Sequence, residues 1–385
     1  VGLGNDRSQV QLDGFKTRAI QASASEQRHL YVTAWHTLNT KDSSSSLRQS
    51  EVLVLQQTGA VHSRHTPTAS LAVGTWSAVV MATAVQHGRL NLQALSALEI
   101  ALTLIQVQAT EESPLTMCLL TSGAQLPLGG LLGAHQAGPL GLARSVRTET
   151  QLPLAHIDAT TTLALKSLAT VTELEAAVRG KRYLVSRLAA APGITTSSAS
   201  LICAPETHVV TGGTGGLGML TARWLGQAGA RSLALASRGG VLAADTAAEF
   251  EQLHASGAVA VVERCDTAEV TQVQRLMALA QGPGCVGVWH SAGVLADSLL
   301  SKQTSASLAT VLAPKAQGAG VLQAATAMAP LRACVLFSSV SALLGGAGQA
   351  NYSAANSILD ALASWRQSCG RSCVSVQWGS WAQVG

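Results

Sequence analysis

The sequence is poor in aromatic and charged residues. Of its 385 residues, 3% are aromatic and 12% are charged, whereas 47% are hydrophobic. The formal net charge of +4 is small and the basic residues are scattered, which argues against nucleic acid as the main partner. No hydrophobic run approaches the roughly 18–20 residues that span a bilayer, and the first residues, VGLGNDRSQVQLDG, do not resemble a secretory signal. Hydrophobic content dominated by Ala, Leu and Val is typical of alternating strands and helices around buried parallel sheets.

No pair of cysteines has the spacing of a metal or redox motif. The seven cysteines include no CxxC, and most of them lie in or beside apolar runs that read as strands. We interpret them as small buried side chains in a reducing compartment, and we expect a cytoplasmic protein with no metal site and no disulfide.

The first half of the chain alternates predicted strands and helices but has no glycine-rich phosphate loop. We interpret residues 1–27 as a linker or the tail of an upstream domain, with one possible strand at 10–20. Over residues 28–190, short apolar runs and helical spacing predict strands at 29–36, 51–56, 116–121, 153–158 and 182–188 and helices at 91–106, 138–151 and 161–180.

A second alternating series follows a small, polar stretch that we interpret as a linker, residues 191–206. From 207 to 385 the sequence predicts strands at 207–211, 232–237, 258–266, 285–290, 331–339 and 372–378. Six strands joined by helices indicate a doubly wound parallel sheet. The predicted fold class is therefore α/β with two Rossmann-like subdomains, and only the second has features of a cofactor site.

The first predicted strand of the second series runs into a glycine motif and a helix, in the segment THVVTGGTGGLGMLTARWLG. Gly213, Gly215 and Gly218 give the pattern G-x-G-x-x-G, which lets backbone N–H groups approach a pyrophosphate at a helix N-terminus. Alone the motif is weak, and the alternative is a flexible turn. A strand before it and a helix after it favour dinucleotide binding.

The end of the next strand predicts which dinucleotide is bound. An NAD enzyme usually has Asp or Glu there, but this sequence has Ser237 and Arg238. A hydroxyl and a guanidinium suit a 2′-phosphate, so we expect NADPH, although Arg238 alone could be a solvated surface residue. Asp266, after the third strand, either accepts a hydrogen bond from the adenine amino group or caps the following helix. The HSAGV turn, residues 290–294, lets the backbone pass close to the cofactor.

A candidate catalytic pair follows the fifth strand. Ser338 and Ser339 end that strand, and Tyr352 begins a helix thirteen residues after Ser339. In this position a serine can polarise a substrate carbonyl and a tyrosine can donate a proton to it. Such a tyrosine needs a nearby cation, yet the residue four positions later on the same helix face is Asn356 instead of a lysine.

Together, TGGTGGLG, HSAGV, the Ser/Tyr spacing and YSAAN resemble the short-chain dehydrogenase/reductase superfamily. More narrowly, they are similar to ketoreductase domains of polyketide synthases, with animal-type fatty acid synthases as close relatives. In that family the lysine and asparagine are exchanged, and LAPKAQGAGVLQ places Lys315 24 residues before Ser339. The resemblance implies the catalytic residues Lys315, Ser339, Tyr352 and Asn356.

The resemblance implies NADPH-dependent reduction of a β-ketoacyl thioester on an acyl carrier protein, within a larger synthase. Lys315 would lower the tyrosine pKa and position the nicotinamide ribose, and Asn356 would hold the proton relay. Residues 28–190 resemble the noncatalytic structural subdomain, and the lid and last strand of the family are missing after WGSWAQVG. The cofactor residues implied are Thr211, Gly213, Gly215, Gly216, Leu217, Gly218, Ser237, Arg238, Asp266, Ala292 and Gly293.

Three alternatives stay open: a fatty acid synthase ketoreductase, a free-standing carbonyl reductase and an inactive scaffold domain. The family also implies a stereochemical preference. Members that give the D-hydroxyl product often carry Leu-Asp-Asp after the HSAGV-like turn, and L-specific members carry Trp five residues after the serine. Here Asp297 keeps the second acidic position and Leu344 replaces the Trp. We expect the D product, unless Asp297 only caps a helix.

Overall fold

The computed structural model describes residues 31–38, 52–56, 78–82, 90–125, 130–159, 173–180, 182–191, 206–281 and 285–379. The possible strand at 10–20 and most of the expected linker lie outside these residues. The chain divides into two compact units, Val1–Ala34 with Arg187–Thr196, and Trp35–Ser186 with Ser197–Gly385. Among the described residues, the smaller unit contains only the start of one strand and the end of another.

In the first half, the described strands are β1 (Tyr31–Leu38), β2 (Val52–Gln56), β3 (Ala78–Ala82), β4 (Thr116–Thr121), β5 (Leu154–Ala159), β6 (Glu175–Arg179) and β7 (Arg182–Ala190), with helices α2 (Leu90–Gln108), α3 (Gly130–His135) and α4 (Gly138–Glu149). Within the larger unit the strand order is β7-β6-β5-β4-β3-β2. All these pairs are parallel except β6 with β7. This arrangement agrees with the predicted α/β class.

Two elements of the first half differ from the sequence prediction. The helix predicted at 161–180 is wrong where the structure describes it, because Glu175–Arg179 is strand β6. The segment reverses at Gly180, whose φ of +60° suits glycine, and Arg179 then pairs with Arg182 in an antiparallel hairpin. Strand β3 was not predicted, although its sequence AVVMA is a short apolar run.

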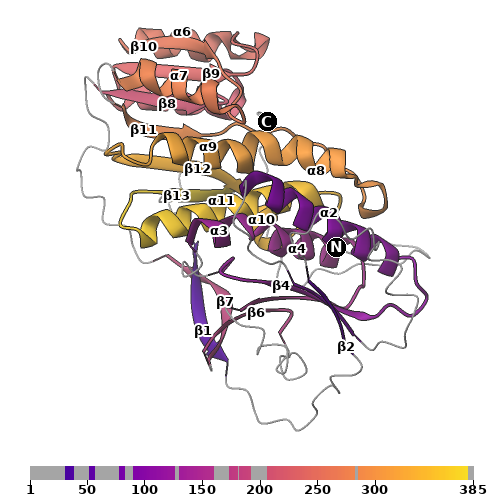
Figure 1. The fold of residues 1–385 in the computed structure, drawn as a ribbon. Coiled ribbons are helices and arrows are strands. Elements are labelled where there is room, and N and C mark those ends of the chain that lie inside the picture. The colour runs from indigo at the N-terminus through magenta and orange to yellow at the C-terminus, as the bar shows by residue number, and fades with distance from the viewer. Residues whose placement is uncertain are drawn as a thin grey trace, which may run out of the picture. The chain divides into compact units, whose positions relative to one another are not determined.

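The second half forms a separate sheet whose strands follow the predicted positions closely. They are β8 (Thr207–Thr211), β9 (Ser232–Ser237), β10 (Val259–Arg264), β11 (Cys285–His290), β12 (Ala333–Ser339) and β13 (Val374–Trp378). Their order is β10-β9-β8-β11-β12-β13, and every pair is parallel. Figure 1 shows this series from β10 at one end to β13 beside α11 at the other. The order reverses between β8 and β11, where a doubly wound sheet binds its ligand.

Helices connect the strands of the second sheet. They are α5 (Gly216–Gln227), α6 (Ala247–Ala255), α7 (Val270–Gln281), α8 (Ser305–Leu312), α9 (Gly318–Ala325), α10 (Val340–Leu344) and α11 (Ala350–Ser368). Short 3₁₀ helices lie at Ala244–Thr246 and Leu300–Lys302, and a π-helical turn, η5, spans Ala313–Gln317.

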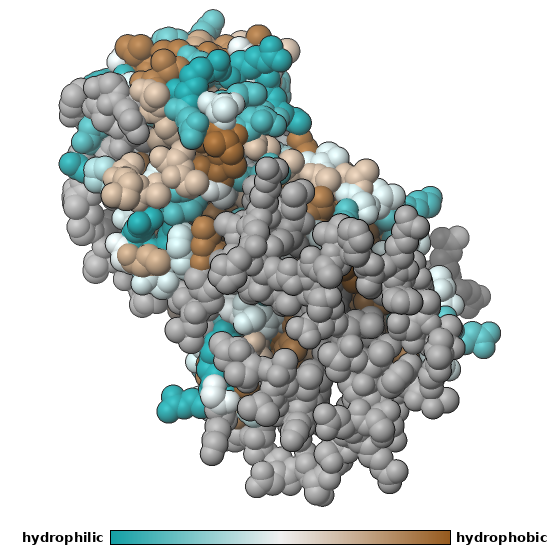
Figure 2. Space-filling model, viewed as in Figure 1, coloured by the Kyte–Doolittle hydropathy of each residue, from teal (hydrophilic) through white to brown (hydrophobic). Residues whose placement is uncertain are grey.

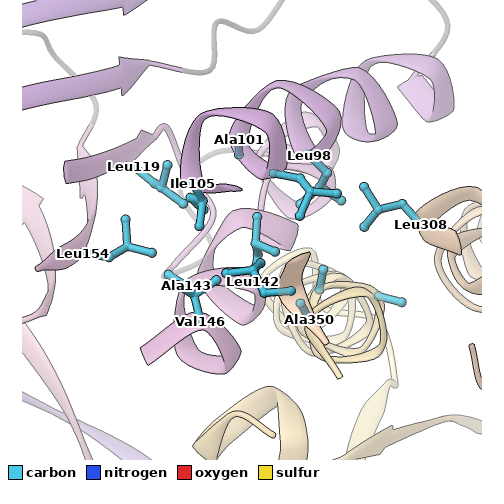
Figure 3. Close-up of a cluster of buried hydrophobic side chains, with 14 of the residues drawn as sticks. Leu98, Ala101, Ile105, Leu119, Leu142, Ala143, Val146, Leu154, Leu308 and Ala350 are labelled. Atoms are coloured by element: carbon cyan, nitrogen blue, oxygen red, sulfur yellow. The ribbon is translucent and has the colours of Figure 1, made fainter. Parts of the chain in front are cut away.

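The two halves share one hydrophobic core within the larger unit. Figure 3 shows Leu98 of α2 and Leu142 of α4 packed with Leu308 of α8 and Ala350 of α11. Close approach is required, because a Cβ at Gly141 on α4 would lie 2.2 Å from the carbonyl oxygen of Ser353 on α11. Burial of this apolar surface stabilises the packing of α4 against α11, the helix that carries Tyr352.

No described helix is long and apolar enough to span a membrane. Figure 2 shows hydrophilic and hydrophobic side chains interspersed over the second half. Exposed hydrophobic residues such as Val241, Val259 and Met328 are spread over different elements.

Most described cysteines are buried, as expected from the apolar runs in which they lie. Cys118, Cys265, Cys334 and Cys373 are buried free thiols, whereas Cys369 is exposed. Among the described residues, no group of three or more His, Cys, Asp and Glu side chains is arranged to hold a metal ion.

Candidate active site

A cavity of about 790 Å³ opens at the carboxyl ends of the strands of the second sheet. Its lining includes the glycine turn after β8, the end of β9, the HSAGV turn after β11, the end of β12 and Tyr352 on α11. This is the place where doubly wound sheets bind ligands, at the reversal of strand order. The cavity therefore unites motifs that are more than 100 residues apart in the sequence.

The glycines of the turn have different tasks. Gly215 is the extended N-cap of α5 and has no side-chain cap, and an added Cβ would meet only the carbonyl oxygen of Gly212 at 3.7 Å. A Cβ at Gly218 would lie 2.1 Å from that same oxygen, so glycine is required for the turn to close. Gly213 packs against Leu235 of β9 and does not line the cavity. The turn thus leaves free N–H groups of α5 facing the cavity.

Most predicted cofactor residues line the cavity: Gly215, Gly216, Leu217, Gly218, Ser237, Arg238, Ala292 and Gly293. Thr211, Gly213 and Asp266 do not. The exposed Arg238 has no hydrogen bond or ion pair with any described residue. Its guanidinium is therefore available to a ligand at the end of β9.

Thr211 is occupied by an internal contact. Its hydroxyl lies 2.7 Å from Nδ1 of His290, and Nε2 of His290 lies 3.0 Å from the backbone carbonyl of Lys315. Because a carbonyl only accepts, Nε2–H donates to it and Nδ1 accepts from Thr211. Burial lowers the pKa of His290 to about 4, which keeps the ring neutral. Thr211 and His290 thus position the backbone of Lys315 instead of touching a ligand.

Asp266 neither lines the cavity nor caps α7, which begins at Val270. Its Oδ1 accepts a hydrogen bond from the backbone N–H of Ala268 at 3.0 Å, in the turn before α7. This is the local side-chain-to-backbone bond that Asp forms in turns.

Lys315 and Asn356 meet inside the protein. Lys315 is 4% exposed, and its Nζ donates to Oδ1 of Asn356 at 3.0 Å and to the carbonyl of Phe337 at 2.9 Å. Nδ2 of Asn356 in turn donates to the backbone carbonyl of Tyr352 at 2.9 Å. Lys315 belongs to the π-helical turn η5, a distortion often found at functional sites. Burial lowers the pKa of Lys315 to about 8.

Gly293 makes room for this lysine. A Cβ at Gly293 would lie 2.8 Å from Cε of Lys315. The glycine of the HSAGV turn was predicted to let the backbone approach a cofactor, and it also lets the lysine side chain pass.

Tyr352 lines the cavity beside the lysine. Nζ of Lys315 lies 5.0 Å from the centre of its ring. The expected lowering of the tyrosine pKa is not found: burial raises the pKa of Tyr352, the hydrogen bond with Asn356 lowers it, and the charge of Asp297 raises it. Tyr352 therefore stays protonated and able to donate at neutral pH.

The two serines at the end of β12 both line the cavity but differ in their hydrogen bonds. Ser339 lines the cavity, and its Oγ accepts from the backbone N–H of Ser341 at 3.2 Å as the N-cap of α10. The capped hydroxyl keeps its own proton, which can be donated into the cavity. Ser338 is buried, and its Oγ donates to the carbonyl of Asn356 at 3.3 Å.

Asp297 does not cap a helix. The helical turn that follows has Leu299 at its N-cap with no side-chain bond. Oδ2 of Asp297 instead accepts from Nε2 of Gln349 at 2.9 Å. Leu344 is 65% exposed at the end of α10 and does not line the cavity.

Several lining residues were not predicted. They include Thr214, Cys265, Thr267, Leu295 and Trp378. Thr214 lies inside the glycine motif and was open to prediction, but Trp378 reaches the cavity only because β13 pairs beside β12.

Comparison with known proteins agrees with this geometry. Residues 206–383 match the sequence model of the KR domain family. The chain is 39% identical over 317 residues to polyketide synthase GfsB of Streptomyces halstedii, covering 74% of this chain and 6% of that protein. It is 45% identical over 180 residues to polyketide synthase GfsA of the same organism, covering 46% of this chain and 2% of that protein.

Solved structures give the same result. A structure titled as A-type ketoreductases from a modular polyketide synthase superposes with a TM-score of 0.79 at 29% identity, over 92% of this chain and 83% of that one. Fold and site define an α/β domain with a doubly wound parallel sheet and a cavity at the position where such sheets bind dinucleotides. The chain belongs to the ketoreductase domains of polyketide synthases.

Proposed function

We propose that this chain reduces a β-ketoacyl thioester to the β-hydroxyacyl thioester with NADPH. The observation that carries the proposal is the meeting of Lys315, Ser339 and Tyr352 in the cavity that also holds the glycine turn. The lysine comes from η5, the serine from β12 and the tyrosine from α11.

The cavity fits a dinucleotide with a 2′-phosphate. The N–H groups of Gly216 and Leu217, in the first turn of α5, would hold the pyrophosphate, and the unpartnered Arg238 together with Ser237 would hold the 2′-phosphate. The sequence offers no carboxylate at the end of β9 to hold an unphosphorylated ribose. When bound, NADPH would supply the hydride.

The chain's own residues would orient and protonate the ketone. The hydroxyls of Ser339 and Tyr352 would hydrogen-bond the carbonyl oxygen, and Tyr352 would donate its proton to that oxygen as charge develops. Lys315, which Asn356 holds in place, would supply positive charge near the tyrosine and a donor for the nicotinamide ribose. The regions that match this chain make up 6% of GfsB and 2% of GfsA, which supports a place for this chain within a larger synthase.

The substrate would be attached to an acyl carrier protein, and neighbouring synthase domains would be partners. We propose the domain division 1–27, 28–190, 191–206 and 207–385, in which only the last part binds NADPH and 28–190 supports it. The hydrophobic core that α2 and α4 share with α8 and α11 is the observation behind the supporting role of residues 28–190.

We further propose the D-β-hydroxy product. Asp297 is present where D-specific family members carry an acidic residue, and its bond to Gln349 fixes the loop beside the cavity. The side from which the tethered chain enters decides which carbonyl face meets the hydride, and a barrier difference of about 1.4 kcal/mol gives a tenfold ratio. Chiral chromatography of the product checks this, and a predominantly L product refutes it.

Fluorescence titration and turnover test the function. We expect NADPH binding and reduction of β-ketoacyl thioesters of graded length. An inactive scaffold would bind no NADPH, and a free-standing carbonyl reductase would reduce small ketones but no carrier-bound substrate.

A further inference from the structure

The last residue of helix α4, in the first half of the chain, contacts two loops of the second half. Oε1 of Glu149 accepts a hydrogen bond from the backbone N–H of Leu300. Oε2 of the same carboxylate accepts from the backbone N–H of Gly348 at 2.9 Å. The bonded residues lie 151 and 199 positions away in the sequence. One side chain therefore joins three distant segments.

Both loops flank the cavity. Leu300 follows the segment that contains the lining residues Val294 and Leu295, and Gly348 lies just before the helix of Tyr352. The loops also contact each other, because the N–H of Ser298 donates to the carbonyl of Gly348 at 2.8 Å. Their relative position fixes the Asp297–Gln349 pair at the edge of the site.

Neighbouring residues of α4 hold the loop before Tyr352 as well. Oγ of Ser145, one turn before Glu149, accepts from the N–H of Gly346 at 3.2 Å and donates to Oγ of Ser353 at 2.7 Å. Nη1 of Arg144 donates to the carbonyl of Ala342 at 2.6 Å. Figure 3 shows α4 packed on α11 through Leu142 and Ala350, so this row of polar contacts stands on a rigid base.

We propose that Glu149 is a positioning residue, which holds the two loops in register and thereby sets how the substrate is presented to Tyr352. The proposal rests on the proposed reductase function. Glu149 does not line the cavity and acts only through Leu300 and Gly348. Both carboxylate oxygens are used, and hydrogen bonds to an ionised acceptor are stronger than neutral ones. The cofactor residues on α5 and β9 lie outside these loops, so NADPH binding is not part of this role.

The test is Glu149→Gln, which keeps the size of the side chain but replaces one acceptor oxygen with a donor. Glu251→Gln is the matched control, because Glu251 is an exposed glutamate on α6. Ile157→Val in β5 is the control for stability, since Ile157 is buried in a separate core cluster. For each variant we would measure Tm, NADPH Kd, kcat and KM for a β-ketoacyl thioester, the product enantiomer ratio and backbone hydrogen exchange.

We expect Glu149→Gln to keep the NADPH Kd within about twofold, to lower kcat/KM about tenfold or more and to shift the enantiomer ratio. Backbone hydrogen exchange should be faster than in the wild-type chain in the two peptides that contain Leu300 and Gly348. Neither control variant should change the enantiomer ratio. This should hold even if Ile157→Val lowers Tm as much as Glu149→Gln does. An unchanged ratio and kcat/KM in Glu149→Gln, or the same changes in Ile157→Val, would overturn the proposal.

The two proposals fail in different ways. A wild-type chain that binds no NADPH and reduces no thioester refutes the reductase. If backbone hydrogen exchange in both loops of Glu149→Gln is as slow as in the wild-type chain, the role of Glu149 is refuted whatever the activity of the variant. If the Gln variant does not fold, unprotected amides at Leu300 and Gly348 in the wild-type chain give the same refutation.

Discussion

Nζ of Lys315 lies 3.0 Å from Oδ1 of Asn356. Asn356 stands at the helix position where a lysine was expected, and its side chain instead binds the ammonium group of a lysine from elsewhere in the chain. Asn356 lies one turn after Tyr352 on α11 and also donates to the backbone carbonyl of that tyrosine. The lysine enters from η5, between the sheet and α11. An amide four residues after the tyrosine is therefore compatible with a lysine beside its ring, 5.0 Å from the ring centre.

Replacing Tyr352 by Phe removes the proposed proton donor while leaving the ring in place. We expect reduction to fall about 10²–10⁴-fold, the usual contribution of general acid catalysis, with NADPH affinity nearly unchanged. Steady-state kinetics and fluorescence titration measure the two effects. Tyr183→Phe in β7 is the control, and a Tyr352→Phe variant with most of its activity would contradict the assignment.

The buried Lys315 should make stability depend on pH. Its folded pKa is about 8, below the ordinary value of 10.5, because burial disfavours the cation. Between these pH values the unfolded chain binds the proton and the folded chain does not, so the free energy of unfolding rises with pH there. Between pH 8 and pH 10.5, the free energy of unfolding of the wild-type chain should rise by on the order of 3 kcal/mol relative to that of Lys315→Met. Denaturant titrations from pH 7 to pH 10.5 measure it, and parallel curves for the two proteins would refute it.

Reversing the charge at Arg238 should change cofactor preference. The aspartate of Arg238→Asp would repel a 2′-phosphate and accept a hydrogen bond from a free ribose hydroxyl. We expect the ratio of kcat/KM for NADPH over NADH to fall about 10–100-fold, in line with the loss of a charged hydrogen bond. Arg371→Asp, at an exposed arginine after α11, is the control. Equal use of both cofactors by the unmodified protein would count against the assignment.

Adding one methyl group at Gly293 should displace the lysine. The new Cβ of Gly293→Ala would lie 2.8 Å from Cε of Lys315, closer than carbon atoms approach without movement. We expect kcat to fall about tenfold or more, because Lys315 then leaves Asn356 and Tyr352. Gly239→Ala is the control, since its Cβ would meet only Cγ2 of Val241 at 3.5 Å. Kinetics of both variants test this, and equal activity would show that the lysine adapts.

The second sheet was predictable because each strand is a short apolar run with glycine or polar residues at its ends. Ser232–Ser237 and Cys285–His290 begin and end where the sequence indicated. The hairpin of β6 and β7 was not predictable in the same way, since ELEAAVRG also has helical composition. Its conformation depends on pairing with Leu184 and Tyr183 and on the positive φ of Gly180.

The sequence alone determined the fold class, the glycine turn and the residue types of the site, because these depend on local pattern and spacing. Only the tertiary structure decided which of them meet. Thr211 is taken by His290, Asp266 bonds its own turn, and Lys315 reaches Asn356 across 41 residues. The carboxylate of Glu149 bonds two loops from a helix of the other half. The contacts of Glu149 depend on the packing of α4 against α11, and no local sequence pattern encodes where two packed helices bring their side chains.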